Sequence, residues 1–286
     1  MVNFERISLQ PALYLVATPI GRARDITLHA LDVLASADVL AAEDTRVLRR
    51  LMQIHGVPMA GRPLLTLHDH SGAGARATLV RHVSEGKSVA YCSDAGTPLV
   101  SDPGFDLVTA VRDAGGSVTM APGPSALPMA LALSGLPSDR FLFAGFLPNT
   151  EAARRRKLET LQDVPATLVF YENPKRVLKS LQAMAETLGM GRQAALCREL
   201  TKRFETVVSA PLGELPALLA LQSLKGECVL LVGPPVAQGG ELPNIDAALR
   251  EALQTMHVKE AATVVAGAHG LKRRDVYQRA LNLKVR

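Results

Sequence analysis

The sequence predicts an α/β fold in two domains followed by a small helical region, and three observations lead to this prediction. The chain has 286 residues, which at roughly 100–200 residues per domain is enough for two. Short β-branched or Leu-rich runs alternate with longer segments whose apolar residues recur every three or four positions. Segments rich in Pro and Gly interrupt this alternation at 121–124 and 234–240. We therefore expect domains over residues 1–121 and 122–235 and a helical region over 241–286.

The first domain is expected to hold a mostly parallel sheet covered by helices, because each strand-like run is followed by a helical pattern. The expected strands are Leu13–Ala17, Val39–Ala42, Leu64–Leu67, Ser88–Ser93 and Ser117–Ala121. The expected helices are Thr27–Ala37, Thr45–His55, Gly74–Glu85 and Phe105–Ala114. Asp25 or Thr27 suits the N-cap of the first helix. Gly86 and Gly115 directly follow two of the expected helices, at the position where a C-cap glycine is typical.

The second domain is expected to hold a mixed sheet, since its strands follow one another more closely and allow hairpins. The expected strands are Phe141–Phe146, Ala166–Tyr171, Gln193–Glu199, Phe204–Ser209 and Glu227–Val232. The expected helices are Ser125–Ser134, Glu151–Gln162, Pro174–Leu188 and Leu212–Leu221.

Three short helical patterns follow the second Pro/Gly segment, at Ile245–Met256, Val258–His269 and Leu271–Leu283. From residue 258 onward there are seven Lys and Arg against two acidic residues, an excess of five that equals the excess of the whole chain. His269-Gly270 resembles the turn of a helix-turn-helix unit. This basic region either contacts nucleic-acid phosphates or is a solvated helical face.

Composition excludes several classes of protein. A charged fraction of 21% and a mean hydropathy of +0.14 argue against a disordered chain. No apolar stretch reaches the roughly 18 residues of a membrane helix, and we see no secretory signal. The three Cys are odd in number and far apart, which predicts small core residues in a reducing cytoplasm. With aromatics at 4% and no Trp, we expect base stacking not to dominate any RNA contact.

Polar or Gly-rich loops follow all five strands of the first domain. In a parallel sheet the carboxyl ends of the strands share one edge, where ligands bind. Isolated turns would have the same composition, but five in succession favour a ligand site. The loops are Thr18–Gly21, Glu43–Arg46, His68–His70, Asp94–Pro98 with Ser101–Gly104, and Gly123–Ala126.

Motifs typical of other chemistries are absent from the sequence or lack the context that they require. The G-x-G-x-x-A match at 72–77 does not follow a strand directly, and a P-loop is absent from the sequence. His68-Asp69-His70 lacks a third metal ligand at a recognisable spacing, so we expect no metal site. A nucleophile elbow is also absent. The carboxylates Glu43, Asp44, Asp94 and Asp102, with Arg46, suit a neutral-to-cationic, hydroxyl-rich small molecule.

At these loops the sequence resembles a known family. The motifs, in order, are Thr18–Gly21 with Asp25–Thr27, Ala41–Arg46, Ser93–Gly104, Pro122–Ala126, Gly135–Phe141, Gly145–Pro148, Phe170–Glu172, Arg198–Lys202 and Lys225–Glu227. Together they resemble the rRNA small subunit methyltransferases of the tetrapyrrole methylase superfamily, from about residue 11 to the C-terminus. Arg22-Ala23 and Ser71-Gly72 replace the family's usual Asn-Leu and Asn-Glu.

The resemblance implies an S-adenosylmethionine-dependent enzyme of two α/β domains with the cofactor in the cleft between them, usually a homodimer. It implies methylation of a cytidine ribose 2′-hydroxyl in 16S rRNA of the small ribosomal subunit. Carried over position by position, it assigns cofactor contacts to Pro19, Gly21, Asp94, Gly96, Thr97, Ser125 and Ala126.

Catalytic roles stay open between several residues. Glu43, Asp44 and His68 are candidates for a base that receives the hydroxyl proton, and Arg46 or Lys202 for clamping a flanking phosphate. The alternative is that Asp44–Arg46 and Glu199–Lys202 are structural ion pairs. Two other functions also remain: a tetrapyrrole C-methyltransferase of the same superfamily, or a non-catalytic RNA-binding assembly factor.

Overall fold

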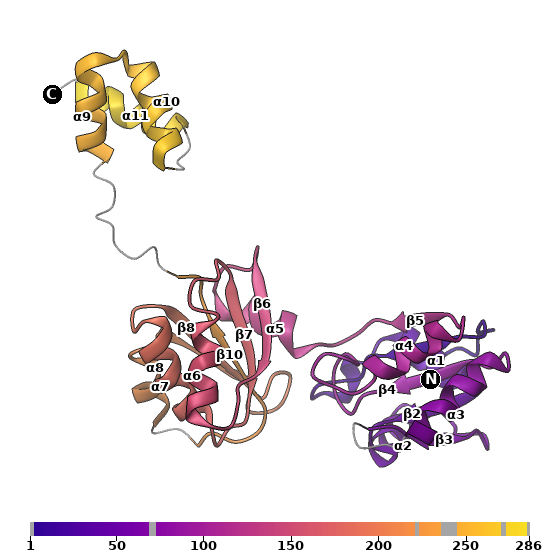
Figure 1. Cartoon of the computed structure of the whole chain (residues 1–286). Coiled ribbons are helices and arrows are strands. Elements are labelled where there is room, and N and C mark those ends of the chain that lie inside the picture. Colours follow the sequence, from indigo (N-terminus) through magenta and orange to yellow (C-terminus); the bar gives the residue numbers. More distant parts are fainter. Residues whose placement is uncertain (1–2, 69–72, 221–222, 236–244, 270–272, 285–286) are drawn as a thin grey trace. The chain divides into compact units, whose positions relative to one another are not determined.

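The computed structural model describes residues 3–68, 73–220, 223–235, 245–269 and 273–284. The chain divides into two compact units, Met1–Pro234 and Pro235–Arg286. The first unit contains two sheets of five strands each, and the second contains only helices among its described residues (Figure 1).

The first sheet is entirely parallel, with the strand order β3-β2-β4-β1-β5. Its strands are β1 (Leu13–Val16), β2 (Val39–Ala42), β3 (Leu64–Thr66), β4 (Val89–Cys92) and β5 (Val118–Ala121). The three central strands β2, β4 and β1 are buried along almost their whole length, as expected of a sheet covered on both faces. The predicted parallel sheet is confirmed, and its strand ends share one edge.

Helices cover both faces of this sheet. Its α-helices are α1 (Leu28–Ser36), α2 (Thr45–Ile54), α3 (Ala73–Ser84) and α4 (Phe105–Asp113), and a short 3-10 helix, η1 (Ala23–Asp25), precedes α1. Residues of α1 and α2 pack with Val16 and Leu40 in one core cluster, and residues of α3 and α4 pack with Leu13 and Tyr91 in another. Thr27 caps α1 as predicted, because its Oγ1 accepts a hydrogen bond from the N–H of Ala30 at 3.1 Å.

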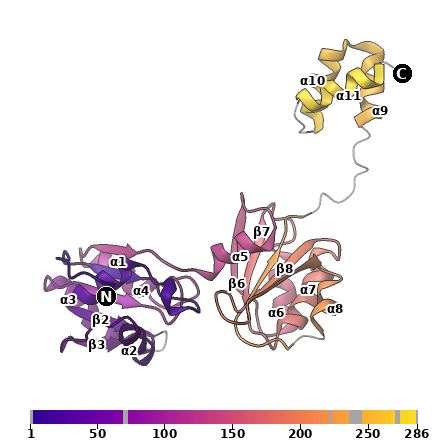
Figure 2. The same cartoon turned by 180° about the vertical axis from the view of Figure 1, so that it is seen from behind.

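The second sheet is mixed, in the order β6-β7-β10-β8-β9. Its strands are β6 (Phe141–Phe146), β7 (Thr167–Glu172), β8 (Gln193–Arg198), β9 (Thr206–Pro211) and β10 (Cys228–Val232). Only β6 and β7 pair in parallel. Helix α5 (Ala126–Ser134) packs on one face, and α6 (Glu151–Glu159), α7 (Val177–Leu188) and α8 (Leu215–Ala220) pack on the other (Figure 2). The mixed sheet is also confirmed.

Strand β9 starts two residues later than the sequence predicts. Residues 199–205 form tight turns, in which the N–H of Lys202 donates to Glu199 and the N–H of Glu205 donates to Lys202. Pairing with β8 therefore starts at Thr206, opposite Arg198, and leaves the Phe204 ring 61% exposed.

The second unit consists of α9 (Ile245–Thr255), α10 (Val258–His269) and α11 (Arg273–Lys284). These helices have a small core of their own, formed by Leu249, Ala262, Val265, Ala266, Val276 and Ala280. Nε of Arg279 lies 2.7 Å from Oδ1 of Asp246 and ties α11 to α9. The predicted turn at His269-Gly270 continues into residues 270–272, which lie outside the described residues. Among the helices described, none is both long and apolar enough to span a membrane.

Candidate active site

Loops from both sheets of the first unit surround a cavity of about 450 Å³, which we call the main cavity. From the first sheet come residues after β1, β2, β4 and β5. From the second sheet come the ends of β6 and β7, Leu200 after β8, and the start of β10. The predicted site residues that line it are Glu43, Asp94, Gly96, Thr97, Ser125 and Ala126. Pro19, Gly21, Asp44, Arg46, His68 and Lys202 are not among its lining residues.

Three loops of the first sheet are fastened to one another beside this cavity. Thr18 and Gly96 exchange two backbone hydrogen bonds, at 2.8 and 2.9 Å. Thr97 Oγ1 donates to the carbonyl of Pro124 at 3.1 Å. Gly96 has φ +84°, and a Cβ there would meet Ile20 at 3.4 Å, so glycine suits both the backbone conformation and the close approach. The loops predicted to bind one ligand are thus held as one surface.

Asp94 is held at the cavity wall by the neighbouring strand end. Its Oδ1 accepts the backbone N–H of Asp44 at 2.8 Å. The side chain of Asp44 turns to its own helix instead, where it caps α2 and pairs with Arg46 at 2.6 Å. Hydrogen bonds from the Arg46 side chain and backbone lower the pKa of Asp44 to about 2.

The main cavity has an acidic lining. Five carboxylates contribute to it, Glu43, Asp94, Asp102, Glu172 and Glu227, whereas none of its described lining residues is Lys, Arg or His. Glu172 is buried, with Oε2 accepting from Ser180 at 2.6 Å, Oε1 accepting from the N–H of Asn173 at 2.8 Å, and Nε of Arg176 3.3 Å from Oε1. Tyr171 beside it has its pKa raised by burial, although hydrogen bonds with Ser125 and Leu127 partly oppose this shift.

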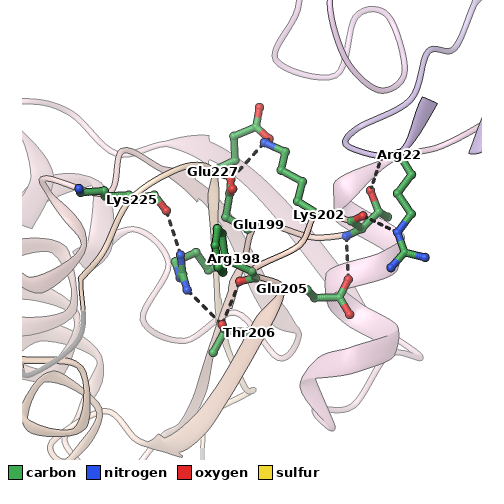
Figure 3. Close-up of polar contacts among 10 residues, drawn as sticks. Arg22, Arg198, Glu199, Lys202, Glu205, Thr206, Lys225 and Glu227 are labelled. Carbon is green, nitrogen blue, oxygen red and sulfur yellow. Dashed lines mark hydrogen bonds and ion pairs between the residues drawn. The ribbon is translucent and has the colours of Figure 1, made fainter. Parts of the chain in front are cut away.

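Gly21 contacts the second sheet's β8–β9 connection rather than the main cavity. A Cβ at Gly21 would overlap Thr201 Oγ1 and would lie 3.0 Å from the carbonyl oxygen of Leu200. Arg22 extends this contact, because its N–H donates to Thr201 Oγ1 at 3.2 Å and its Nε donates to the Thr201 carbonyl at 2.9 Å (Figure 3). Arg22, which departs from the family pattern, thus joins the loop after β1 to the connection between β8 and β9.

Lys202 is the centre of an ion-pair cluster on that connection. Its Nζ lies 3.1 Å from Glu199 and 2.5 Å from Glu227 (Figure 3). Burial alone would lower the pKa of Lys202, but the hydrogen bonds to Glu227 and Glu199 outweigh it and raise the pKa. Gly226 adjoins this cluster with φ +83°, and a Cβ there would collide with the side chain of Glu199.

Both ion pairs that the sequence offered as alternatives to catalytic roles are present. They join Asp44 to Arg46 and Glu199 to Lys202. Each of these charged side chains therefore has a structural partner within its own loop or helix end.

His68 lines a second, smaller cavity of about 190 Å³, which we call the small cavity. Its other lining residues are Leu67, Arg76, Asp102, Pro103, Gly104, Phe105, Asp106 and Leu107. Asp102 lines both cavities. Asp69 and His70 lie outside the described residues.

Comparison with known proteins decides the family. Residues 12–216 match the model of the Tetrapyrrole (Corrin/Porphyrin) Methylases, and residues 240–284 match the RsmI C-terminal HTH domain. The chain is 48% identical to the Ribosomal RNA small subunit methyltransferase I of Mesorhizobium japonicum, over 96% of this chain and 93% of that protein. It is 44% identical to the protein of the same name from Escherichia coli O157:H7, over 95% of each. The chain belongs to the rRNA small subunit methyltransferase I family of tetrapyrrole methylases.

A solved structure agrees with the fold of this methyltransferase family. Uroporphyrin-III C-methyl transferase from Thermus thermophilus, complexed with S-adenyl homocysteine, matches with a TM-score of 0.53 at 21% identity, over 78% of this chain and 97% of that one. The two-sheet α/β architecture of the tetrapyrrole methylases is therefore shown. The domain boundaries, the roles of single site residues and the homodimer stay predictions.

Several lining residues of this family member had no role predicted from the sequence. Phe146, Tyr171, Glu172 and Glu227 all line the main cavity from the second sheet. They lie in the motifs Gly145–Pro148, Phe170–Glu172 and Lys225–Glu227, through which the sequence resembles the family. Membership of these motifs is the sequence signal that points to a role in the site. Among the described residues, no group of three or more His, Cys, Asp or Glu is placed to hold a metal ion.

Proposed function

We propose that this chain transfers a methyl group from S-adenosylmethionine to the 2′-hydroxyl of a cytidine ribose in 16S rRNA of the small ribosomal subunit. The names of its relatives indicate the substrate class, rRNA of the small subunit. The residues that line the main cavity support S-adenosylmethionine as the cofactor. The acidic lining of the main cavity is the observation that carries the proposal.

An acidic, partly apolar cavity suits a cationic ligand. S-Adenosylmethionine carries a sulfonium and an ammonium group, and the carboxylates of Glu43, Asp94 and Asp102 attract both. Glu172 and Glu227 add less, because Arg176 and Lys202 balance their charges. The cavity's 450 Å³ lies within the roughly 300–1,000 Å³ of pockets that hold an entire small molecule. The Thermus thermophilus relative's complex with S-adenyl homocysteine supports the same ligand class.

The lining residues divide into those that hold the cofactor and those that face the acceptor. Asp94 is fixed by the Asp44 N–H and keeps a second carboxylate oxygen for a ribose hydroxyl or the amino group. Gly96 and Thr97 offer backbone groups, and Ser125-Ala126 stand at the start of α5, where helix N–H groups lack intrahelical partners. When bound, S-adenosylmethionine supplies an electrophilic methyl group.

The 2′-oxygen must be held in line with the bond that breaks. Positioning of this kind supplies about 7–11 kcal/mol of barrier reduction, more than a base usually contributes. The hydroxyl proton leaves to a nearby carboxylate or to solvent as the new O–C bond forms. Glu43 lines the main cavity and Asp44 does not, and hydrogen bonds from Arg46 lower the pKa of Asp44 to about 2. We therefore favour Glu43 over Asp44 as the proton acceptor. Asp44 and Lys202 act as positioning residues in this proposal, since each is engaged in ion pairs.

Phosphates of the RNA must lie outside the acidic cavity. Arg46, Arg49 and Arg50 are exposed on α2, shortly after Glu43. In the second unit Lys259, Arg273 and Arg274 are exposed on α10 and α11. Arginine and lysine bind phosphates through charge-assisted hydrogen bonds and counterion release. We propose that both groups of cations hold the subunit RNA while the ribose enters the cavity.

Methyl incorporation into purified small subunits that lack the modification tests this function. With a radiolabelled donor, we expect label in 16S rRNA, located at a single cytidine whose 3′ phosphodiester then resists alkaline hydrolysis. Resistance to alkali identifies the ribose oxygen as the acceptor, because base methylation leaves alkaline cleavage intact.

Two further measurements separate this function from the alternatives. Labelling of a tetrapyrrole and not of RNA would favour a tetrapyrrole C-methyltransferase. Calorimetry without a binding signal for S-adenosylmethionine, together with retained subunit binding, would favour a non-catalytic assembly factor.

A further inference from the structure

The small cavity beside the main cavity has the size and chemistry of a subsite for one RNA base. Its volume of about 190 Å³ is below the roughly 300–1,000 Å³ of pockets that hold an entire ligand. It therefore suits one part of a larger ligand whose remainder lies elsewhere. Asp102 lines both cavities, so a ligand that reaches across Asp102 occupies both.

Phe105 gives this small cavity an aromatic wall. It is the first residue of α4 and is 71% exposed, the most exposed of the large apolar side chains described. Aromatics make up only 4% of the chain, and this one is left uncovered at a cavity. An exposed ring beside polar groups is the arrangement on which single unstacked RNA bases are held.

The polar groups around Phe105 complement the edge of a base. Arg76 is oriented by Asp106, with Nη1 2.8 Å from Oδ2, and its side chain remains 37% exposed. His68 and Asp102 lie on the same cavity. Arginine donates hydrogen bonds to base carbonyl and ring acceptors, and a carboxylate accepts from an exocyclic amino group. Cytosine offers both kinds of group on one edge.

The loop that precedes Phe105 is fixed by buried packing. Tyr91, fully buried in β4, donates its hydroxyl hydrogen bond to the carbonyl of Pro103 at 3.2 Å. Gly104 has φ +126°, and a Cβ there would lie 3.0 Å from the Tyr91 ring and 3.2 Å from Leu99. A side chain at position 104 would thus crowd Tyr91 and Leu99 and strain the backbone. The cavity wall is preorganised, which lowers the entropy cost of binding a base.

We propose that the small cavity binds the base of the nucleotide whose ribose is methylated, with Phe105 as the stacking surface and Arg76 and Asp102 at the base edge. This inference rests on the proposed function, because it takes RNA as the methyl acceptor. One stacked base agrees with the low aromatic content, since a single platform suffices to orient one ribose.

Kinetics of Phe105 variants on small subunits test the proposal. Phe105→Ala should lower kcat/KM for the subunit by roughly 5- to 150-fold, the usual effect of removing one stacked base. Phe105→Tyr should retain near wild-type kcat/KM, and the kcat/KM of Phe105→Leu should lie between those of Phe105→Ala and Phe105→Tyr. Calorimetry should give the same Kd for S-adenosylmethionine in all four proteins. Phe204→Ala, at an exposed Phe outside both cavities, is the matched control and should remain within about twofold of wild type.

A second arm uses subunits reconstituted with 16S rRNA that is abasic at the target nucleotide. If Phe105 stacks on that base, wild type and Phe105→Ala should bind these subunits equally. An active wild type whose kcat/KM is unchanged by Phe105→Ala overturns the subsite alone. The subsite is also overturned if Phe105→Ala weakens binding of the abasic subunits relative to wild type. It is overturned as well if the loss of kcat/KM in Phe105→Ala accompanies a changed oligomeric state in sedimentation. A wild type that methylates no RNA overturns the proposed function, and the subsite with it.

Discussion

The backbone N–H of Asp44 donates to Oδ1 of Asp94 at 2.8 Å, which joins the ends of β2 and β4 at the wall of the main cavity. Asp44 thereby makes two separate contacts. Its N–H orients a cavity carboxylate, while its side chain caps α2 and pairs with Arg46. Asp94 therefore reaches the cavity already oriented, and ligand binding does not have to order it.

Asp94→Asn should weaken S-adenosylmethionine binding about 10- to 150-fold, because it removes the charge of a hydrogen-bonded carboxylate worth about 1.5–3 kcal/mol. The Asn oxygen still accepts the Asp44 N–H, so the fold is retained. Isothermal titration calorimetry measures the effect. Asp113→Asn, at an exposed carboxylate at the end of α4, is the control. Equal affinity in Asp94→Asn and wild type would remove Asp94 from the cofactor site.

Gly21→Ala should destabilise the first unit by about 1–3 kcal/mol, the usual cost of forcing a methyl group into a packed site. The new Cβ would overlap Thr201 Oγ1 and lie 3.0 Å from the backbone oxygen of Leu200, so a side-chain rotation alone cannot relieve the clash. Urea unfolding measures the change. Gly74→Ala is the matched control, since nothing lies within 4 Å of its added Cβ and Ala favours the helix. A Gly21→Ala midpoint as high as that of the control would show that the two loops do not meet here.

Lys202→Gln should lower the free energy of unfolding near neutral pH by about 0.5–1.5 kcal/mol, through loss of its ion pairs with Glu199 and Glu227. Burial by itself would raise the pKa of Glu199, but hydrogen bonds from the Glu227 N–H and Lys202 outweigh it and lower the pKa below 4.5. The stabilisation is therefore present above pH 4.5 and is lost as the pH falls through the lowered value.

The pH dependence of the stabilisation contributed by Lys202 has the opposite sign, because the pKa of Lys202 is raised above 10.5. Its contribution is present below that pH and is lost as the pH rises through the folded-state value. Urea unfolding of wild type and Lys202→Gln, compared at pH 7 and at a pH below the lowered pKa of Glu199, should thus give a smaller difference at the lower pH, where Glu199 becomes protonated. A difference of the same size at both pH values would contradict the ion-pair account.

Arg273→Gln with Arg274→Gln should weaken binding to small subunits and reduce the salt dependence. Each phosphate contact contributes about 0.7–0.9 to the slope of log K against log salt, so losing two should reduce the slope by roughly 1.4–1.8. Filter binding between low and moderate salt measures it, and the Kd for S-adenosylmethionine should stay constant. Arg112→Gln, at an exposed cation on α4, should leave the slope unchanged. A slope equal to wild type in the double variant would mean that these arginines are a solvated helical face.

The sequence by itself determined the two-sheet architecture and most element positions, because hydrophobic periodicity and caps are local signals. Thr27 caps α1, and all five first-sheet strands end at one edge, as predicted. The motifs also pointed to Asp94, Gly96, Thr97 and Ser125, which the structure places around the main cavity.

Only the tertiary structure decided which loops from the two sheets meet. Tyr171 and Glu227 reach the main cavity from the second sheet, at sequence distances over which periodicity carries no information. Gly21 has the right residue type for a cofactor loop, yet it packs against Thr201. His68 lines the small cavity instead of the main one. Whether a polar side chain contacts a ligand, a partner charge or another loop depends on long-range packing, and no local pattern along the chain encodes that choice.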